Sequence, residues 1–359
     1  MSKAPYQKGR GAQMDPQNRF EARSYQTEDS FREHLHREGE DPAQPRKTRY
    51  LKVYPKSIVN RVNSPDIGRA WSMNPYQGCE HGCSYCYARN SHQYWGYSSG
   101  RDFEQTVLVK EKAAALLERT LQKPSWKPDP IMLSGNTDCY QPAEQQFQIT
   151  RQMLKVLQKY RQPVGIITKN ALIKRDIDLL APMAREGLVH VALSVTTLDE
   201  KLRGRLEPRT AAIRQRLKTI ELLAQNEVPV QVMIAPVIPG LNSHEIMAIA
   251  KAVRAAGASA IEHTMVRLND TLGPLFLDWV AHHYPDRLEK IKHGIEATHA
   301  GQLNDSQYGR RMKGEGPEAQ AVKQTMALAR KKYFEGVHMP PYNREAFLRV
   351  PKGQFNLFD

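Results

Sequence analysis

The chain alternates between short apolar runs and longer amphipathic segments along most of its length. Short apolar runs predict buried strands, and apolar residues at helical spacing predict helices that cover them. The predicted strands span residues 71–73, 131–134, 164–168, 189–195, 230–234 and 260–266. The predicted helices span residues 110–122, 144–160, 176–186, 211–226 and 244–256. This alternation is typical of βαβ units, so we predict an α/β fold with a parallel sheet and right-handed crossovers.

The alternation defines a core over residues 50–270, which starts with a strand-like piece at 50–53. Residues 1–49 are polar and charged, and such a composition buries too little apolar surface to offset the entropy of ordering. We therefore predict a disordered or loosely packed N-terminal extension with one short helix at 28–37, able to fold against the core or a substrate. Helices at 275–282 and 318–332 predict a mostly helical extension over 271–345, followed by a flexible tail over 346–359.

The charge balance adds a candidate partner. The 359 residues include 52 Lys and Arg against 38 Asp and Glu, a formal net charge of +14. Such a surplus favours a polyanion, first of all nucleic acid, and a basic surface that only aids solubility is the alternative. No apolar run approaches the roughly 18 residues of a membrane span, and the start lacks a signal-peptide core. We predict a cytoplasmic protein with no membrane association, which also suits cysteines that are clustered rather than paired.

Three of the four cysteines lie in the stretch NPYQGCEHGCSYCYARN, residues 74–90, which we call the cysteine loop. Cys79, Cys83 and Cys86 have the spacing C-x3-C-x2-C, and thiolates favour iron–sulfur clusters or zinc. Glycines at 78 and 82 let the backbone curl around a bound group. Three ligands on a four-iron cluster leave one iron open for a substrate or cofactor. A zinc knuckle completed by His81 or Cys139 is the alternative.

Polar residues follow several of the predicted strands, and the ends of parallel barrel strands are where active sites lie. Gly135 allows a close backbone approach, while Asn136 and Asp138 offer acceptors, the latter also for a cationic amine. Lys169 ends the next strand as a point charge for a carboxylate. Ser194 ends the strand after that and points to the same mouth if the strand alternation holds.

The cysteine spacing, with the aromatic Tyr85 before the last cysteine, resembles the signature of the radical S-adenosylmethionine (SAM) superfamily. The resemblance implies a partial (β/α)6 TIM-type barrel and a [4Fe–4S] cluster held by Cys79, Cys83 and Cys86. It also implies that SAM binds the open iron and is cleaved reductively to methionine and a 5′-deoxyadenosyl radical, which takes a hydrogen from the substrate. An electron donor such as flavodoxin or ferredoxin follows from the same resemblance.

The order TD, TK and S at successive strand ends resembles the SAM-binding positions of the spore photoproduct lyase family. By that resemblance Asp138 contacts the SAM amine or ribose, Lys169 the carboxylate, Ser194 the carboxylate or ribose, and Tyr85 the adenine. Gly135 and Asn136 belong to the same cofactor-binding segment. The stretches KGRGA, SPDIG, TDCYQP, TTLDEKLRGRLEPRTA and APVIPGLN resemble radical SAM proteins that are classed by similarity with DNA repair photolyases.

Cys139 and two basic or apolar stretches leave further hypotheses open. A thiol at Cys139 could donate a hydrogen atom to a product radical, and the alternative is a small buried packing residue. The segment YGRRMKGEG combines cations with a stacking tyrosine, and a solvated loop is the alternative. The terminal Gln354–Phe358 resembles the peptide that docks on the bacterial sliding clamp, and a tail packed on its own barrel is the alternative.

These features predict a radical SAM enzyme, with a lyase as one option, that acts on nucleic acid in DNA lesion repair or base modification. A radical SAM enzyme that acts on a peptide, a protein or RNA is the second hypothesis. A non-catalytic iron–sulfur or zinc protein that binds nucleic acid is the third, and it would not need Asp138, Lys169 and Ser194 together.

Overall fold

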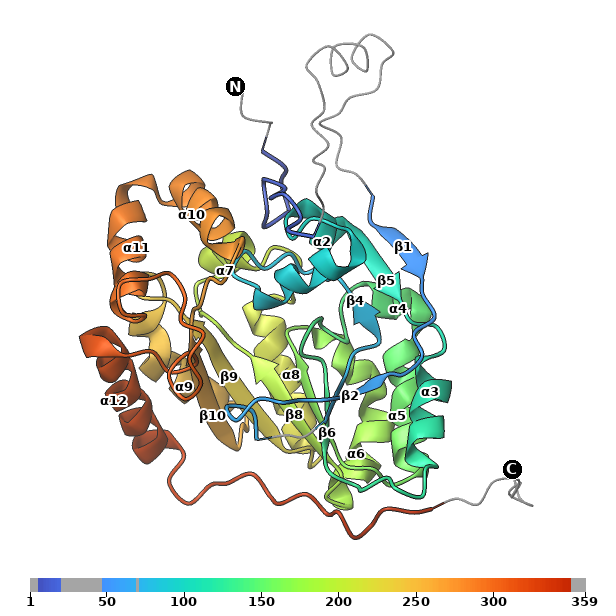
Figure 1. The fold of residues 1–359 in the computed structure, drawn as a ribbon. Helices are drawn as coiled ribbons and strands as arrows, with labels where there is room; N and C mark the ends of the chain where they lie inside the picture. The colour runs from blue at the N-terminus through green and yellow to red at the C-terminus, as the bar shows by residue number, and fades with distance from the viewer. Residues whose placement is uncertain (1–5, 21–46, 69–70, 350–359) are drawn as a thin grey trace.

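A computed structural model of the protein describes residues 6–20, 47–68 and 71–349. Six parallel strands form a curved sheet, as the apolar runs predicted, with an antiparallel strand added at one edge (Figure 1). The order across the sheet is β10, β9, β8, β7, β6, β3 and β2. The strands are β2 Val59–Arg61, β3 Trp71–Met73, β6 Ile131–Leu133, β7 Val164–Thr168, β8 Val189–Ser194, β9 Val230–Val237 and β10 Ala260–Met265. This is the partial (β/α)6 barrel predicted from the sequence.

Helices cover the outer face of the sheet because each presents an apolar stripe to it. They are α3 Ala113–Leu121, α4 Ala143–Phe147, α5 Ile149–Lys159, α6 Ile177–Arg185, α8 Ile213–Gln225 and α9 Ile246–Ala255. The continuous helix predicted over 144–160 is instead divided at Gln148, whose φ of 49° lies in the left-handed region. The main hydrophobic core lies between these helices and the strands.

A smaller layer surrounds the cysteine loop at the end of the barrel where the strands finish (Figure 1). Here β1 Arg49–Lys52 and β4 Tyr76–Gln77 pair with β5 Thr106–Val109. The loop then enters the 3-10 helix η1 Tyr87–Trp95. Two short helices complete the layer, α2 Arg101–Gln105 and α7 Glu200–Leu206.

The C-terminal extension is helical, as predicted, up to its last part. Its helices are α10 Leu272–His283, α11 Leu288–Ala297 and α12 Gly316–Tyr333. Trp279 of α10 is buried in the cluster that also contains Cys83 and Tyr85, so this extension packs against the cysteine loop. After α12 the chain passes along the opposite end of the barrel (Figure 1), where Asn343 N–H donates to Gly187 O and Leu348 N–H to Tyr160 O.

Residues 6–20 differ from the disorder that their composition predicted. Arg10, Ala12 and Asn18 are buried. The N–H groups of Gly11 and Ala12 donate to the Glu104 carboxylate, at 3.1 and 2.8 Å. These contacts order a polar segment through hydrogen bonds rather than apolar burial, which composition does not reveal. The helix predicted at 28–37 and the tail segment Gln354–Phe358 lie outside the described residues.

Within the described ranges, no helix is both long enough and apolar enough to cross a membrane.

Candidate functional site

The three thiols of the cysteine loop lie close together at the mouth of the barrel. Cys79 and Cys83 are buried, Cys86 is partly buried, and none forms a disulfide. Burial raises the pKa of Cys83 well above its usual value, with Glu207 and the other two thiols adding to the rise. Burial also raises the pKa of Cys86, and the neighbouring Cys79 thiol raises it further to a smaller extent. The three sulfurs are therefore near enough to interact electrostatically, as ligands of one shared group must be.

A buried ion pair holds the backbone of this loop. Arg89 donates through Nε and Nη2 to the carbonyl oxygen of Cys83, at 3.0 and 2.9 Å. The same guanidinium pairs with Glu104 at 2.5 Å, and both side chains are fully buried. The loop also requires Gly11, since a Cβ there would lie 1.8 Å from the Gly82 carbonyl oxygen. The KGRGA stretch at residues 8–12 is thus part of the support of the loop.

A second buried pair positions Tyr85. Its hydroxyl donates to Glu207, which also accepts from Thr196 Oγ1 at 2.7 Å. Arg216 Nη2 lies 2.5 Å from the Glu207 carboxylate, and Arg216 Nη1 donates to Ser194 O at 3.0 Å. Burial alone would raise the pKa of Glu207, but Arg216 and then Lys169 lower it to about 2. The carboxylate therefore stays charged and fixes the tyrosine against the end of β8.

Asp138 connects the ends of β6 and β7 to the cysteine loop. Its carboxylate accepts from Thr168 Oγ1 at 2.7 Å and from Lys169 N–H at 2.8 Å. His81 Nδ1 lies 3.3 Å from the same carboxylate. Burial opposes ionisation of Asp138, but His81 and these hydrogen bonds lower its pKa. Protein groups occupy its oxygens in this structure, so its contact with SAM stays a prediction.

The other predicted cofactor-binding residues gather at the same mouth. The ammonium of Lys169 lies 5.9 Å from the centre of the Tyr85 ring. Its charge offsets part of the effect by which burial raises the pKa of Cys83 and Cys86, so it lies near both thiols. Asn136 N–H donates to Asn74 Oδ1 at 3.0 Å, and Gly135 has a φ of 142° that disfavours other residues. Ser194 is buried at the end of β8.

Cys139 lies apart from this group. Its side chain is 0% exposed and belongs to the main core between the sheet and the outer helices. Burial raises its pKa well above the usual value. This location suits the packing alternative for Cys139, and the role as hydrogen donor stays a prediction.

The sequence reasoning missed the two arginine–glutamate pairs. Glu207 lies in the stretch TTLDEKLRGRLEPRTA, which suggests no role for it, and Arg89, Glu104 and Arg216 are not among the predicted site residues. One signal was available for Arg216: it occupies the apolar face of α8, in line with Ile213, Ile220 and Leu223. A charged residue in an apolar stripe predicts a buried partner.

The donor set fits an iron–sulfur cluster and SAM. Three unpaired thiols share one loop, and the cation of Lys169 lies beside them. In the part of the chain that the structure describes, no group of three His, Cys, Asp or Glu could hold a metal ion. That finding concerns single ions, whereas the thiolates of a cluster bind different irons. The assignment of these three thiols as ligands therefore depends on the motif and its family.

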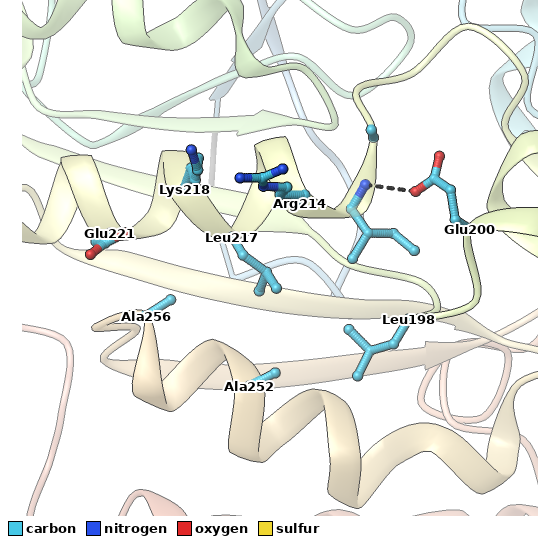
Figure 2. Close-up of a pocket in the computed structure, with 10 residues that line it drawn as sticks. Leu198, Glu200, Arg214, Leu217, Lys218, Glu221, Ala252 and Ala256 are labelled. Atoms are coloured by element: carbon cyan, nitrogen blue, oxygen red, sulfur yellow. Dashed lines mark hydrogen bonds between the residues drawn. The ribbon is translucent and has the colours of Figure 1, made fainter.

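A separate hollow of about 690 Å³ lies outside the barrel, between α8 and α9 (Figure 2). Leu198, Leu217 and Ala252 give it an apolar floor, and Glu200 closes one end by accepting from Ile213 N–H at 3.0 Å. Its lining comes from the outer helices and the start of α7, so it is a groove of the helical layer and not part of the site at the mouth.

Comparisons with known proteins agree with this geometry. The profile of the Radical SAM superfamily matches residues 73–253. An uncharacterized protein of Mycobacterium tuberculosis (strain ATCC 25618 / H37Rv) is 32% identical over 246 residues, which cover 68% of this chain and 72% of that protein. An uncharacterized protein of Methanocaldococcus jannaschii is 29% identical over 195 residues, covering 54% of this chain and 70% of the other.

Among solved structures, spore photoproduct lyase complexed with dinucleoside spore photoproduct has a similar fold. The TM-score is 0.56 at 13% identity, over 80% of this chain and 81% of that one. A cysteine-to-serine mutant of spore photoproduct lyase also scores 0.56 and covers 85% of this chain and 92% of its own, again at 13% identity. At this identity the likeness concerns the fold alone. The superfamily match over residues 73–253 carries the assignment: the chain belongs to the radical SAM superfamily.

Proposed function

We propose that the protein is a radical SAM enzyme that acts on DNA, in lesion repair or base modification. The observation that carries the proposal is the convergence of Cys79, Cys83 and Cys86 with Lys169 at one end of a partial barrel. In this proposal the three thiolates hold a [4Fe–4S] cluster. When bound, the cluster and SAM would supply a 5′-deoxyadenosyl radical that abstracts hydrogen from the substrate.

The residues of the chain have distinct tasks in this proposal. Lys169 provides the cation for the SAM carboxylate, close to the sulfurs of Cys83 and Cys86. Tyr85 is oriented toward the adenine by the Glu207 carboxylate. The burial of the loop excludes water, which protects a reactive intermediate from side reactions. Asp138 and Ser194 complete the cofactor-binding set at the ends of β6 and β8.

The DNA substrate is supported by charge and by the fold. A formal net charge of +14 suits a polyanion. The structurally similar spore photoproduct lyase is complexed with a dinucleoside spore photoproduct. Within the same proposal, a flavodoxin or ferredoxin supplies the electron, and Gln354–Phe358 docks on the sliding clamp. Both of these partners stay predictions.

Anaerobic reconstitution tests the proposal. The protein is loaded with iron and sulfide, reduced with SAM present, and assayed for 5′-deoxyadenosine. We expect the Cys79→Ala, Cys83→Ala and Cys86→Ala variants to lose the iron–sulfur absorbance and at least 100-fold of the product, since each removes a ligand (order of magnitude, about 2.7 kcal/mol). Cys139→Ala is the matched control, because it removes a buried thiol outside the loop, and it should retain both.

The substrate is tested in the same preparation with deuterated DNA. Deuterium in the recovered 5′-deoxyadenosine supports hydrogen abstraction from DNA. Label that arrives only from a deuterated peptide, protein or RNA would overturn the DNA substrate and leave the radical chemistry in place. Loaded, reduced protein that forms no 5′-deoxyadenosine with any substrate would instead favour the non-catalytic hypothesis.

A further inference from the structure

A polar hollow of about 970 Å³ lies beside the C-terminal part of β10, outside the barrel. Its volume is in the upper part of the range of roughly 300–1,000 Å³ that is typical of ligand sites. It lies between His263 of β10, the 307–316 segment and the first turns of α12. The backbone of that segment is fixed to the sheet, because Met265 N–H donates to Met312 O at 2.9 Å. The hollow is thus a feature of the folded core.

The hollow has a surplus of positive charge. Its cations are Arg310, Lys313, Lys323 and Arg330, and its acids are Glu262 and Glu315. The arginines are engaged, Arg330 with Glu262 at 2.8 Å and Arg310 with Asp305 and Glu315. Within the described ranges, neither Lys313 nor Lys323 forms an ion pair, so both ammonium groups are available to an anion.

The surplus of positive charge in the hollow also affects the pKa of His263. Burial, then Arg330 and Lys313, lower its pKa to about 4. Among the described residues its Nδ1 atom is buried without a hydrogen-bond partner. The effect of Arg330 and Lys313 on His263 shows that the potential in the hollow is positive, which favours a bound anion.

Tyr308 presents an aromatic surface at the edge of this hollow. Its side chain is 53% exposed, and Arg311 lies over its ring at 4.5 Å from the centroid. Arg311 in turn pairs with Asp66 at 2.5 Å and donates to Ser64 Oγ at 2.7 Å. Asp66 also accepts from Gly309 N–H at 2.6 Å. The tyrosine is therefore held in place while its ring stays open to solvent, as a platform for base stacking requires.

Two neighbouring arginines, Arg311 and Arg267, connect this platform to Tyr87 at the mouth. Arg267, which follows β10, lies close enough to Arg311 to have its pKa lowered by it, after the larger effect of burial. The Arg267 guanidinium also lies over the Tyr87 ring, 5.4 Å from its centre. Tyr87 is 48% exposed, and its hydroxyl donates to Gly135 O at the end of β6. The path thus begins at the hollow and ends at the predicted SAM-binding segment.

We propose that the hollow binds the backbone of a single-stranded nucleic acid, with Lys313 and Lys323 on phosphates and Tyr308 stacked on a base. The strand then follows Arg311 and Arg267 to Tyr87, so that one of its nucleotides reaches the mouth of the barrel. This inference rests on the proposed function and specifies how its substrate is held. A single strand suits the path because stacking on an exposed tyrosine needs a base whose face is free.

Fluorescence anisotropy with a labelled single-stranded DNA oligonucleotide tests the proposal on the full chain. Lys313→Ala/Lys323→Ala should weaken binding about tenfold at low salt and reduce the slope of log K against log salt by about 1.4, because two phosphate contacts are lost. Tyr308→Ala should weaken binding about tenfold and leave that slope unchanged, since stacking is uncharged. Lys155→Ala/Lys251→Ala is the charge-matched control, because these exposed lysines lie on α5 and α9.

Equal losses for the two lysine pairs would mean that net charge alone binds the oligonucleotide, and this would overturn the proposal. Stronger binding of the duplex than of the single strand would also overturn it. Failure here is separate from failure of the proposed function, since SAM cleavage is measured without nucleic acid. A variant that loses binding but still forms 5′-deoxyadenosine supports the inference, and a wild-type protein that binds in the expected way without cleaving SAM would contradict only the function.

Discussion

Two buried arginine–glutamate pairs contact the cysteine loop, and they differ in what the glutamate holds. Glu104, paired with Arg89, accepts from the backbone N–H groups of Gly11 and Ala12. Glu207, paired with Arg216, accepts from two side-chain hydroxyls, those of Tyr85 and Thr196. The first pair therefore fixes the course of two backbone segments, and the second fixes the direction of one aromatic side chain.

The difference matters because a cluster site needs both kinds of order. The Cys83 carbonyl receives two hydrogen bonds from Arg89, which sets the shape of the loop between the second and third thiols. Tyr85 lies inside that interval, and its hydroxyl is held by Glu207, which directly follows helix α7. The pair that contacts the N-terminal segment thus shapes the backbone of the loop, and the pair on the barrel side orients Tyr85. Loss of either pair should therefore have its own signature.

The largest expected effect comes from removing one partner of either pair. Arg89→Met and Arg216→Met should each lower the free energy of unfolding by about 3–5 kcal/mol, because each leaves a buried carboxylate without its cation. Urea unfolding measures both. Limited proteolysis separates them: Arg89→Met should expose residues 6–20 to cleavage, whereas Arg216→Met should leave that segment protected. The double variant Arg216→Met/Glu207→Gln should lose less stability than the sum of the losses in the two single variants. Such a difference would show that the stability depends on the interaction between the two side chains.

Arg344→Met is the control for this prediction. Arg344 pairs with Asp129 at 2.9 Å on the surface, and an exposed pair contributes only about 0–1 kcal/mol. If Arg89→Met or Arg216→Met cost no more than Arg344→Met, the two buried pairs would not support the loop as described.

The barrel was predictable from the sequence because its signals are local. Strand β7 occupies Val164–Thr168, the range that its apolar run predicted. The break at Gln148 was not predictable, since neither glycine nor proline stands there. The N–H groups of Thr150 and Arg151 donate to the Glu144 carboxylate across the break, and no sequence pattern signals that contact. Strand β5 and helix α11 were also missed. Residues 106–109 are buried through pairing with β1 and β4, which lie far away in the sequence.

The candidate site also combines local features, which the sequence shows, with contacts between distant residues, which it does not show. The spacing of Cys79, Cys83 and Cys86 is local, and the sequence was sufficient to single out the loop. The contact between Tyr85 and Glu207 joins residues 122 positions apart, and no periodicity encodes it. For Cys139 the sequence leaves two roles open, because a position next to Asp138 does not say which way the side chain points. The structure buries it in the core.

Acid provides a second way to distinguish the two pairs, through His92. Burial, with a smaller contribution from the neighbouring charge of Arg89, lowers the pKa of His92 to about 4. The unfolded chain takes up this proton near pH 6.5 and the folded chain only near pH 4. Stability is therefore complete above pH 6.5 and falls as the pH decreases toward 4, at about 1.4 kcal/mol per pH unit for this residue and by about 3 kcal/mol over the whole window.

The measurement is urea unfolding at several pH values for the wild type and for His92→Gln, which cannot titrate. The variant should show a shallower loss of stability between pH 6.5 and 4. Other histidines with lowered pKa values, such as His283, titrate in both proteins and cancel in the difference. Proteolysis at pH 5 should detect opening near residues 6–20 before any near Tyr85. Parallel pH profiles for the two proteins would show that His92 is protonated without disturbing the Arg89 side.

The smallest expected effect is confined to the contact between the N-terminal segment and the loop. In Gly11→Ala the new Cβ would meet the Gly82 carbonyl oxygen at 1.8 Å and the Ser84 nitrogen at 3.2 Å, and both are backbone atoms that cannot swing aside. The segment must shift, at a cost of about 1–3 kcal/mol. Gly204→Ala is the control, because nothing lies within 4 Å of its Cβ and alanine favours helix α7 by about 0.5–1 kcal/mol.

Because Gly11→Ala leaves Arg89 and Glu104 in place, it asks whether the segment itself or the ion pair shapes the loop. If the segment contributes, Gly11→Ala should hold the iron–sulfur absorbance less well after reconstitution than Gly204→Ala does. If the absorbance is unchanged while residues 6–20 become sensitive to protease, the pair alone positions the Cys83 carbonyl. The backbone N–H groups of Gly11 and Ala12 then serve only as hydrogen-bond donors to the Glu104 carboxylate, Gly11 to Oε2 and Ala12 to Oε1.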